Sequence, residues 1–388
     1  MLALYPRRLN LPSRSFFLFG PRGTGKTTRL GMQLPNATWF DLLETKNLLD
    51  LMRNPDHFRI RVEALEKGSW IVIDEIQRMP ELLNEIHAIM NRQPDKYRFA
   101  IIGSSARKLK RGGVNLLAGR AINRQFFPLV GDELGYEFEI DDLLRFGTLP
   151  AVAAEDSDAD KINVLEAHNA NYVREEIQQE AAVKNLDSFT RFLEIAGILN
   201  AQMTNVAAIA RDAAVARPTV QGYFQILVDT LIGTWLPAWQ PRIKVKEVKH
   251  PKFYFFDPGV VRGVTGKLRE TLAADERGWL LETVVLNELR AWIQMSNYGG
   301  KLYYWRTPSG GEIDFVWVRD KQAIGIEIKA GAQWRTEFSR SLKKLKESGS
   351  LQKCFGVYCG SRRLQDGPVT ILPLKQFMMA LSNGDVLP

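Results

Sequence analysis

Eight residues near the N-terminus have the types and spacing of a phosphate-binding loop. They read Gly20-Pro21-Arg22-Gly23-Thr24-Gly25-Lys26-Thr27 and satisfy the pattern G-x-x-x-x-G-K-[ST]. Glycines let such a loop turn its backbone N–H groups toward phosphate oxygens, and a following helix N-terminus adds a favourable field. We expect Lys26 to reach the β- and γ-phosphates and Thr27 to bind Mg²⁺. An apolar run precedes the loop and a plausible helix follows it, so the pattern predicts a Mg·ATP site.

A pair of carboxylates, Asp74 and Glu75, follows the apolar run Trp70-Ile71-Val72-Ile73. An acidic, solvated strand end is one interpretation of this pattern. Beside a phosphate-binding loop, the pattern favours a Walker B arrangement, in which Asp74 orients Mg²⁺ and Glu75 positions or polarises the attacking water.

Hydrolysis also needs a polar sensor and positive charge near the γ-phosphate. A third apolar run ends in Gly103-Ser104-Ser105-Ala106-Arg107, and we expect Ser104 or Ser105 to contact the γ-phosphate or the attacking water. The positive charge is often an arginine supplied by a neighbouring subunit. Arg107 and Arg120 are the candidates, and a solvated surface position is the alternative for both.

Near the C-terminus, Asp314, Glu327 and Lys329 form the pattern D-x12-E-x-K. Glu327 and Lys329 are two residues apart in a strand-like segment, so they project to the same face. A metal-dependent nuclease needs this geometry: Asp314 and Glu327 would bind Mg²⁺ or Mn²⁺, and Lys329 would orient or deprotonate water. Glu282, on a predicted helix, would support the metal or the lysine. The alternative is a domain that serves in binding or assembly without cleaving DNA.

The segments Val206–Asp212 and Pro218–Leu227 are predicted to be two helices of a helix-turn-helix. A strand-like segment follows, with charged and apolar residues alternating, as in a wing that reaches a DNA backbone. Proteins also use such modules to bind proteins, and alternation is typical of any half-exposed strand. The candidate DNA contacts are Arg217, Thr219, Gln221, Arg242, Lys244 and Lys246.

The elements that must position these residues follow two patterns. In the first third, apolar runs alternate with amphipathic stretches, which predicts a parallel sheet with helices packed on it. The expected strands are Phe16–Phe19, Ala37–Asp41, Trp70–Ile73, Phe99–Ile102 and Ile122–Phe127. From residue 141 to about 199 the pattern is helical, including Ala167–Gln179 and Phe189–Ile198, and residues 242–249 read as a strand. Later segments read as a helix, Glu276–Met295, and as strands Leu302–Trp305, Ile313–Val318 and Ala323–Ile328.

The composition is that of a folded protein with two or three domains. The 388 residues include 45% hydrophobic and 25% charged residues, which excludes a disordered or fibrous chain. The net charge of +8 favours a polyanionic partner such as nucleic acid. The two cysteines, Cys354 and Cys359, form neither a disulfide framework nor a metal motif, which is typical of a reducing cytoplasm. We expect neither secretion nor contact with a membrane, because no suitable apolar segment occurs.

Taken together, the motifs resemble those of the prokaryotic AAA+ ATPases that carry a C-terminal domain of unknown function. The resemblance rests first on residues 20–28, 73–78, 103–107 and 117–120, in this order. Residues 217–220, 278–282 and 311–315 resemble later markers of the family, so the likeness covers nearly the whole chain. It adds Thr28 to the nucleotide-binding residues.

The resemblance implies an α/β fold: a P-loop AAA+ core with a parallel sheet, followed by a helical connector, a winged helix and an α+β PD-(D/E)XK nuclease-like domain. The corresponding ranges are 1–135, 136–187, 188–250 and 251–388. It also implies a ring-like homo-oligomer.

Two functions remain open on these grounds. One is a cytoplasmic ATPase that couples hydrolysis to DNA binding, translocation or remodelling. The other is a slow nucleotide-driven switch that controls a protein partner and performs no DNA chemistry.

Overall fold

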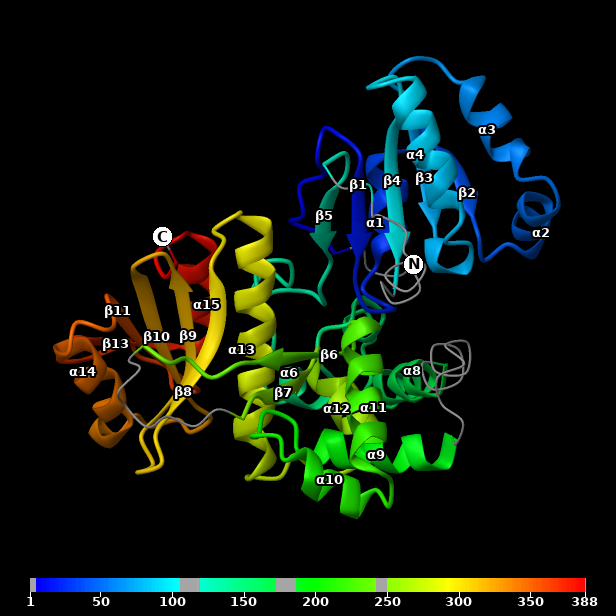
Figure 1. The fold of residues 1–388 in the computed structure, drawn as a ribbon. Helices are drawn as coiled ribbons and strands as arrows, with labels where there is room; N and C mark the ends of the chain where they lie inside the picture. The colour runs from blue at the N-terminus through cyan, green and yellow to red at the C-terminus, as the bar shows by residue number, and fades with distance from the viewer. Residues whose placement is uncertain (1–4, 105–116, 118, 172–185, 242–249, 388) are drawn as a thin grey trace. The chain divides into compact units, whose positions relative to one another are not determined.

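The computed structural model describes residues 5–104, 117, 119–171, 186–241 and 250–387 (Figure 1). The chain divides into two compact units. The N-terminal unit consists of Arg7–Phe127 with Asp229–Ile232, and the C-terminal unit of Met1–Pro6, Pro128–Val228 and Gly233–Pro388. The N-terminal unit contains one sheet, and the C-terminal unit contains a larger sheet and a two-stranded ribbon.

The N-terminal unit is built on a five-stranded parallel sheet with the order β2-β3-β4-β1-β5. Its strands are β1 (Phe16–Phe19), β2 (Thr38–Asp41), β3 (Trp70–Asp74), β4 (Arg98–Gly103) and β5 (Ile122–Gln125). The inner strand β1, between β4 and β5, is buried on both faces, which is why it reads as a continuous apolar run rather than an alternating one. The predicted parallel sheet is confirmed.

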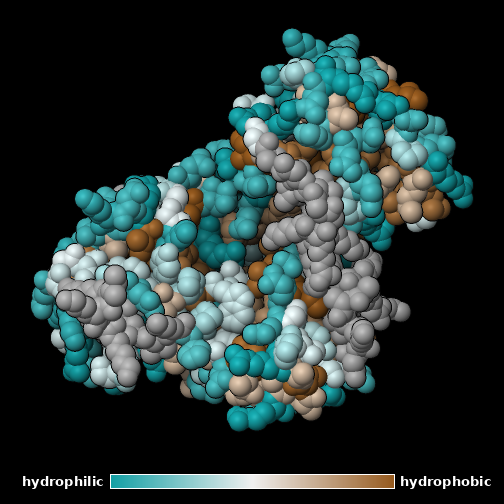
Figure 2. Space-filling model, viewed as in Figure 1, coloured by the Kyte–Doolittle hydropathy of each residue, from teal (hydrophilic) through white to brown (hydrophobic). Residues whose placement is uncertain are grey.

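Helices bury both faces of this sheet. They are α1 (Lys26–Gln33), α2 (Thr45–Arg53), α3 (Asp56–Glu63) and α4 (Leu82–Arg92), with the short 3-10 turn η1 (Ile76–Arg78) after β3. Phe16 and Leu18 pack with Leu30 of α1, whereas Phe17 packs in a separate core with Phe58 of α3. Alternate residues of one strand thus serve opposite faces. Figure 2 shows hydrophobic patches over α2 and α3, where Met52 and Ile60 are exposed.

The first part of the C-terminal unit is mainly helical. Its helices are α6 (Ile140–Phe146), α7 (Pro150–Ala153), α8 (Asp158–Asn171), α9 (Leu186–Ile198), α10 (Val206–Asp212), α11 (Arg217–Asp229) and α12 (Pro258–Val264). The predicted helices at 189–198, 206–212 and 218–227 all lie within α9, α10 and α11. The predicted helix 167–179 is described only up to Asn171, and the predicted strand 242–249 lies outside the described residues.

A small antiparallel ribbon follows α11. Its strands are β6 (Gly233–Leu236) and β7 (Lys252–Phe255). Aromatic side chains join the ribbon to the helices: Phe224 of α11 contacts Trp235 of β6 and Phe253 of β7, and also Phe192 of α9. Helix, turn, helix and ribbon therefore form one packed group.

The rest of the C-terminal unit contains a six-stranded mixed sheet with the order β12-β13-β11-β10-β9-β8. The strands are β8 (Lys301–Arg306), β9 (Glu312–Arg319), β10 (Gln322–Lys329), β11 (Lys353–Tyr358), β12 (Leu364–Asp366) and β13 (Val369–Pro373). The helices are α13 (Glu276–Met295), α14 (Arg340–Glu347) and α15 (Leu374–Ser382), with the 3-10 turn η3 (Thr336–Ser339). Helix α14 packs on β9, β10 and β11, while α13 contacts β10 and α15 (Figure 1).

No helix within the described ranges is long and apolar enough to cross a membrane.

Candidate functional site

The phosphate-binding loop joins β1 to α1, as predicted. Gly23 and Gly25 have φ angles of 82° and 87°, a region that favours glycine. Gly20 approaches the neighbouring strand so closely that a Cβ atom there would lie 2.5 Å from the Phe126 carbonyl oxygen. The Lys26 ammonium donates to the carbonyl oxygens of Gly20 at 2.7 Å and Pro21 at 2.9 Å. The backbone therefore has the conformation that only these glycines permit.

Thr27 and Asp74 meet at the carboxyl end of the sheet. The Thr27 hydroxyl donates to Asp74 Oδ2 at 2.7 Å. Burial raises the pKa of Asp74, while the hydrogen bond from Thr27 opposes this shift. A hydroxyl and a carboxylate are hard oxygen ligands of the kind that Mg²⁺ prefers, so this pair fits the ion that the loop motif implies.

Glu75 belongs to a second polar group, with Gln77 and Ser104. The Gln77 amide donates to Ser104 Oγ at 2.8 Å and also to Glu75 Oε2. Ser104 donates to the same Glu75 oxygen at 3.4 Å. Glu75 has a φ of 57°, an unusual backbone conformation for a non-glycine residue. The structure thus brings the predicted Walker B glutamate and one predicted sensor serine together, and it adds a glutamine that holds both.

The other predicted residues of this site divide into three groups. Arg22 is half-buried in the loop, and Thr28 is exposed on α1. Ser105 and Arg107 lie outside the described residues. Arg120 precedes β5, whereas the phosphate-binding loop follows β1; Phe16 pairs with Ile122 in this parallel register. Arg120 therefore lies at the opposite edge of the sheet from its own loop.

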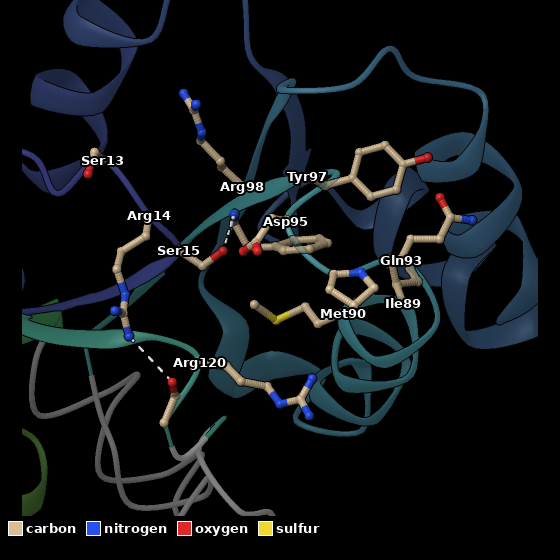
Figure 3. Close-up of a pocket in the computed structure, with 13 residues that line it drawn as sticks. Ser13, Arg14, Ser15, Ile89, Met90, Gln93, Asp95, Tyr97, Arg98 and Arg120 are labelled. Atoms are coloured by element: carbon tan, nitrogen blue, oxygen red, sulfur yellow. Dashed lines mark hydrogen bonds between the residues drawn. The ribbon is translucent and has the colours of Figure 1, made fainter.

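A cavity of about 450 Å³ surrounds Arg120 at that amino edge (Figure 3). Arg14 and Arg98 also line it, together with Ser15 and Tyr97. Arg14 donates to the Gly119 carbonyl at 3.4 Å, which holds the turn before β5 against the start of β1.

Arg7 supports the loop from behind, and nothing in the sequence pattern singled it out. Its guanidinium donates to the carbonyl oxygens of Thr24 at 2.5 Å and Phe127 at 2.7 Å, and it stacks 4.0 Å from the centre of the Phe126 ring. The side chain is buried. It therefore fixes the loop to the end of the strand that Gly20 approaches.

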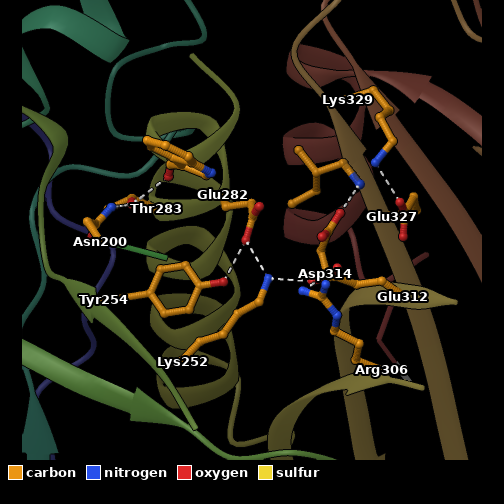
Figure 4. Close-up of polar contacts among 12 residues, drawn as sticks. Asn200, Lys252, Tyr254, Glu282, Thr283, Arg306, Glu312, Asp314, Glu327 and Lys329 are labelled. Carbon is orange, nitrogen blue, oxygen red and sulfur yellow. Dashed lines mark hydrogen bonds and ion pairs between the residues drawn. The ribbon is translucent and has the colours of Figure 1, made fainter. Parts of the chain in front are cut away.

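In the C-terminal unit, Asp314, Glu327 and Lys329 lie together on β9 and β10 (Figure 4). Lys329 Nζ contacts Glu327 Oε1 at 2.6 Å, and Asp314 Oδ2 accepts the backbone N–H of Ile328 at 2.7 Å. Burial raises the pKa of Asp314 and of Glu327. These groups line a pocket of about 580 Å³.

The predicted Glu282 has partners in this pocket that the sequence did not predict. Glu282 of α13 accepts from the Tyr254 hydroxyl at 2.6 Å and from Lys252 Nζ at 3.3 Å, and Lys252 also contacts Glu312 at 2.9 Å. Burial raises the pKa of Glu282 to about 7. Burial acts to lower the pKa of Lys252, but the surrounding carboxylates, Glu282 foremost, outweigh it and raise that pKa.

This donor set does not fit the second metal ion that the nuclease pattern implies. Glu282, Glu312 and Glu327 each face a lysine of the protein. Throughout the described ranges, no three His, Cys, Asp or Glu side chains are grouped so that they could hold a metal ion. Glu282 directly contacts Lys252, a partner that the sequence did not predict.

Among the candidate DNA contacts, Arg217 and Gln221 are exposed at the start of α11, and Thr219 is half-buried. Arg242, Lys244 and Lys246 lie outside the part of the chain that the structure describes.

Comparison with known proteins agrees with the N-terminal site. Residues 12–135 match a family described as "AAA domain". Residues 137–271 and 277–377 match two further families, described as "Domain of unknown function (DUF8612)" and "Domain of unknown function (DUF4143)". The phosphate-binding loop and the acidic pair thus lie within an AAA-type P-loop ATPase domain on a five-stranded parallel sheet.

Among curated proteins, the chain is 26% identical to "Uncharacterized protein Rv2008c" of Mycobacterium tuberculosis and to "Uncharacterized protein Mb2031c" of Mycobacterium bovis. Each alignment spans 377 residues, 95% of this chain and 82% of the relative.

Two solved structures are more distant. The Thermotoga maritima RuvB Holliday junction branch migration motor is 17% identical over 58% of this chain and 82% of that one, with a TM-score of 0.28. The Bacillus subtilis DNA clamp loader delta protein is 12% identical over 70% and 94%, with a TM-score of 0.23. Scores this low transfer neither structural detail nor function.

Proposed function

We propose that this protein binds Mg·ATP and hydrolyses it at the carboxyl edge of the N-terminal sheet. One observation carries the proposal: Asp74 and Glu75, at the end of β3, contact Thr27 of the loop and Ser104 after β4, respectively. Separate strands thus deliver the groups that phosphoryl transfer requires to one edge, where parallel α/β sheets bind their ligands.

Each residue has a specific role in this proposal. Thr27 and Asp74 would hold Mg²⁺, which neutralises charge on the β- and γ-phosphates. The Lys26 ammonium leaves its loop carbonyls for the phosphate oxygens. Glu75 positions the attacking water, and Ser104 orients Glu75 or contacts the γ-phosphate.

The test of this site is nucleotide binding by Lys26→Ala. We expect the variant to lose measurable binding of a fluorescent ATP analogue. Lys67→Ala, which removes an exposed lysine of the same unit, should bind like the wild type. Equal affinity of Lys26→Ala and the wild type would exclude the loop as the nucleotide site.

We further propose that Arg120 acts on the nucleotide of a second copy in a ring-like homo-oligomer. Its place at the amino edge of the sheet keeps it from its own phosphate-binding loop. Mixing Lys26→Ala and Arg120→Ala proteins should therefore restore ATPase activity. In a mixed ring, some interfaces combine the intact loop of the Arg120→Ala subunit with the intact Arg120 of the Lys26→Ala subunit. A mixture no more active than the sum of the two variants would contradict this role.

We propose that hydrolysis is coupled to DNA. The net charge of +8 and the exposed Arg217 and Gln221, at the start of the second helix of α10–α11, support the coupling. Duplex, single-stranded or branched DNA should raise the ATPase rate, and binding should weaken with salt. Arg217→Ala with Gln221→Ala should reduce this stimulation, whereas exposed Lys321→Ala should not. If no DNA changes the rate or binds, the nucleotide switch acting on a protein partner is the better account.

DNA cleavage by the C-terminal pocket is a second candidate function, favoured by the grouping of Asp314, Glu327 and Lys329; it requires that a divalent ion displace the Lys252 ammonium from Glu282 and Glu312. The test is incubation of labelled DNA with Mg²⁺ or Mn²⁺, comparing the wild type with Asp314→Ala. Equal products from both proteins would show that this pocket does not cleave DNA.

A further inference from the structure

The C-terminal pocket contains its own buried cation. The ammonium of Lys252 lies between Glu282 on α13 and Glu312 on β9, at 3.3 and 2.9 Å, and the side chain is only 5% exposed (Figure 4). The Tyr254 hydroxyl donates to the same Glu282 oxygen at 2.6 Å. Lys252 thus lies where carboxylates from two elements converge.

The charges of the pocket nearly balance within the protein. Its buried and half-buried carboxylates are Glu282, Glu312, Asp314 and Glu327, and its cations are Lys252, Lys329 and Arg306; the exposed Glu337 also lines the pocket and contacts Arg335 at 3.6 Å. Lys329 contacts Glu327 at 2.6 Å, and Arg306 contacts Glu312 at 3.3 Å. Buried carboxylates need compensating positive charge. Removal of one of these side-chain cations therefore leaves the carboxylates able to bind a cation from solution.

The strand that carries Lys252 is firmly attached. Asn200 accepts the backbone N–H of Phe255 at 2.8 Å and donates to Thr283 Oγ1 of α13 at 2.8 Å. Lys252 itself pairs with Leu236 in the β6–β7 ribbon and forms a bridge with Met203. The ammonium is therefore held in place by the backbone that follows the α10–α11 helices.

We propose that Lys252 is the resident cation of this pocket and that it excludes divalent metal ions from the carboxylates. Its ammonium occupies the oxygen ligands that a metal would need. A divalent ion binds only when it displaces the Lys252 ammonium or when the lysine is removed. This proposal is independent of the ATPase function, which resides in the other unit.

The test is binding of Mn²⁺, without nucleotide, by the full-length protein, measured by calorimetry and by Mn²⁺ spin resonance. Because Mg²⁺ or Mn²⁺ also binds P-loop sites with nucleotide, every protein carries Lys26→Ala. Lys252→Met should bind one Mn²⁺ at least about tenfold more tightly than the protein with Lys252, since it leaves uncompensated buried carboxylates. Lys252→Arg, which keeps the positive charge, should bind no better than the protein with Lys252.

Two further proteins place the new site and guard against misfolding. Lys252→Met combined with Asp314→Asn and Glu282→Gln should lose the gained affinity, which locates the ion in this pocket. Lys252→Gln offers a polar neutral side chain if Lys252→Met does not fold. Tight Mn²⁺ binding by the protein with Lys252, lost on Asp314→Asn, would overturn the proposal without any Lys252 variant. Unchanged affinity in folded Lys252→Met or Lys252→Gln would overturn it as well.

Discussion

Gln77 is the residue on which the geometry of the proposed catalytic group most depends. Its amide nitrogen joins Glu75 to Ser104, and its Oε1 atom is buried, without a hydrogen-bond partner among the described residues. A Cβ atom on Gly103 would lie 2.9 Å from that oxygen, so the glycine leaves just enough room for the side chain. Gln77 therefore acts as a positioning residue for Glu75.

Replacement of Gln77 by methionine keeps the size of the side chain and removes its hydrogen bonds. We expect kcat for ATP hydrolysis to fall by about ten- to a hundredfold through misplacement of Glu75, with KM nearly unchanged. Steady-state kinetics separate the two constants. A rise in KM at constant kcat would show that Gln77 serves nucleotide binding and not the positioning of Glu75.

Among single residues, the sequence predicted those whose roles can be recognised from a short continuous motif. The glycines, Lys26 and Thr27 form one uninterrupted motif, and Asp74 with Glu75 directly follows a strand. Gln77 and Lys252 were not predicted, because their roles depend on partners far away in the chain: Ser104 is 27 residues from Gln77, and Glu282 is 30 from Lys252. Such pairs exist only after the sheet and helices have packed.

Among the elements, the end of β5 and the loop after β1 are linked by one buried arginine. Arg7 donates to the carbonyl oxygens of both Thr24 and Phe127. We expect Arg7→Ala to weaken ATP binding and to lower the free energy of unfolding of the N-terminal unit by about 2–4 kcal/mol, since it leaves buried carbonyls unpaired. Exposed Arg8→Ala is the matched control. Thermal unfolding and nucleotide titration of both variants check this; equal behaviour would contradict it.

Helix α13 has a buried carboxylate that makes stability depend on pH. Glu288 accepts the backbone N–H of Gly131 and the Trp292 indole N–H, and burial raises its pKa from 4.5 to about 8. Between these two pKa values the folded state therefore binds a proton that the unfolded state has lost. The contribution of Glu288 to the free energy of unfolding is fully present below pH 4.5 and is lost as the pH rises through about 8.

Substitution of this carboxyl by an amide should flatten that profile. Because the amide does not titrate, we expect the fall in the free energy of unfolding between pH 4.5 and about 8 to be smaller by about 1–3 kcal/mol in Glu288→Gln than in the wild type. Thermal melts of the wild type, Glu288→Gln and exposed Glu347→Gln over this pH window measure it. A wild-type slope retained in Glu288→Gln would contradict the assignment.

The elements themselves were predicted unevenly. Helix Glu276–Met295 was predicted with both ends correct, because it is long and its apolar positions recur regularly. The ribbon strands β6 and β7 were not predicted. Each has only four residues, and their pairing joins segments more than a dozen residues apart. A strand of four residues shows too little periodicity to be recognised in the sequence, and tertiary packing determines whether it forms.

For the whole molecule, the alternation of strands and helices predicted the class of the N-terminal fold but not its strand order. The order β2-β3-β4-β1-β5 inserts β4 between β3 and β1, so Ser104 follows the strand beside β1 and Asp74 ends the next strand along. No local pattern encodes it. The nuclease pattern in the sequence also did not include Lys252 of β7, which contacts Glu282 and Glu312 and changes what these carboxylates can bind.

The central claim is that ATP is hydrolysed at the edge formed by β1, β3 and β4. The most direct test compares turnover and nucleotide retention in Glu75→Gln with those of the wild type. The substitution keeps the size of the side chain and leaves Lys26, Thr27 and Asp74 in place. We predict that the variant binds ATP as the wild type does, hydrolyses it at least about a hundredfold more slowly, and retains unhydrolysed ATP after gel filtration. Turnover at the wild-type rate would contradict the account.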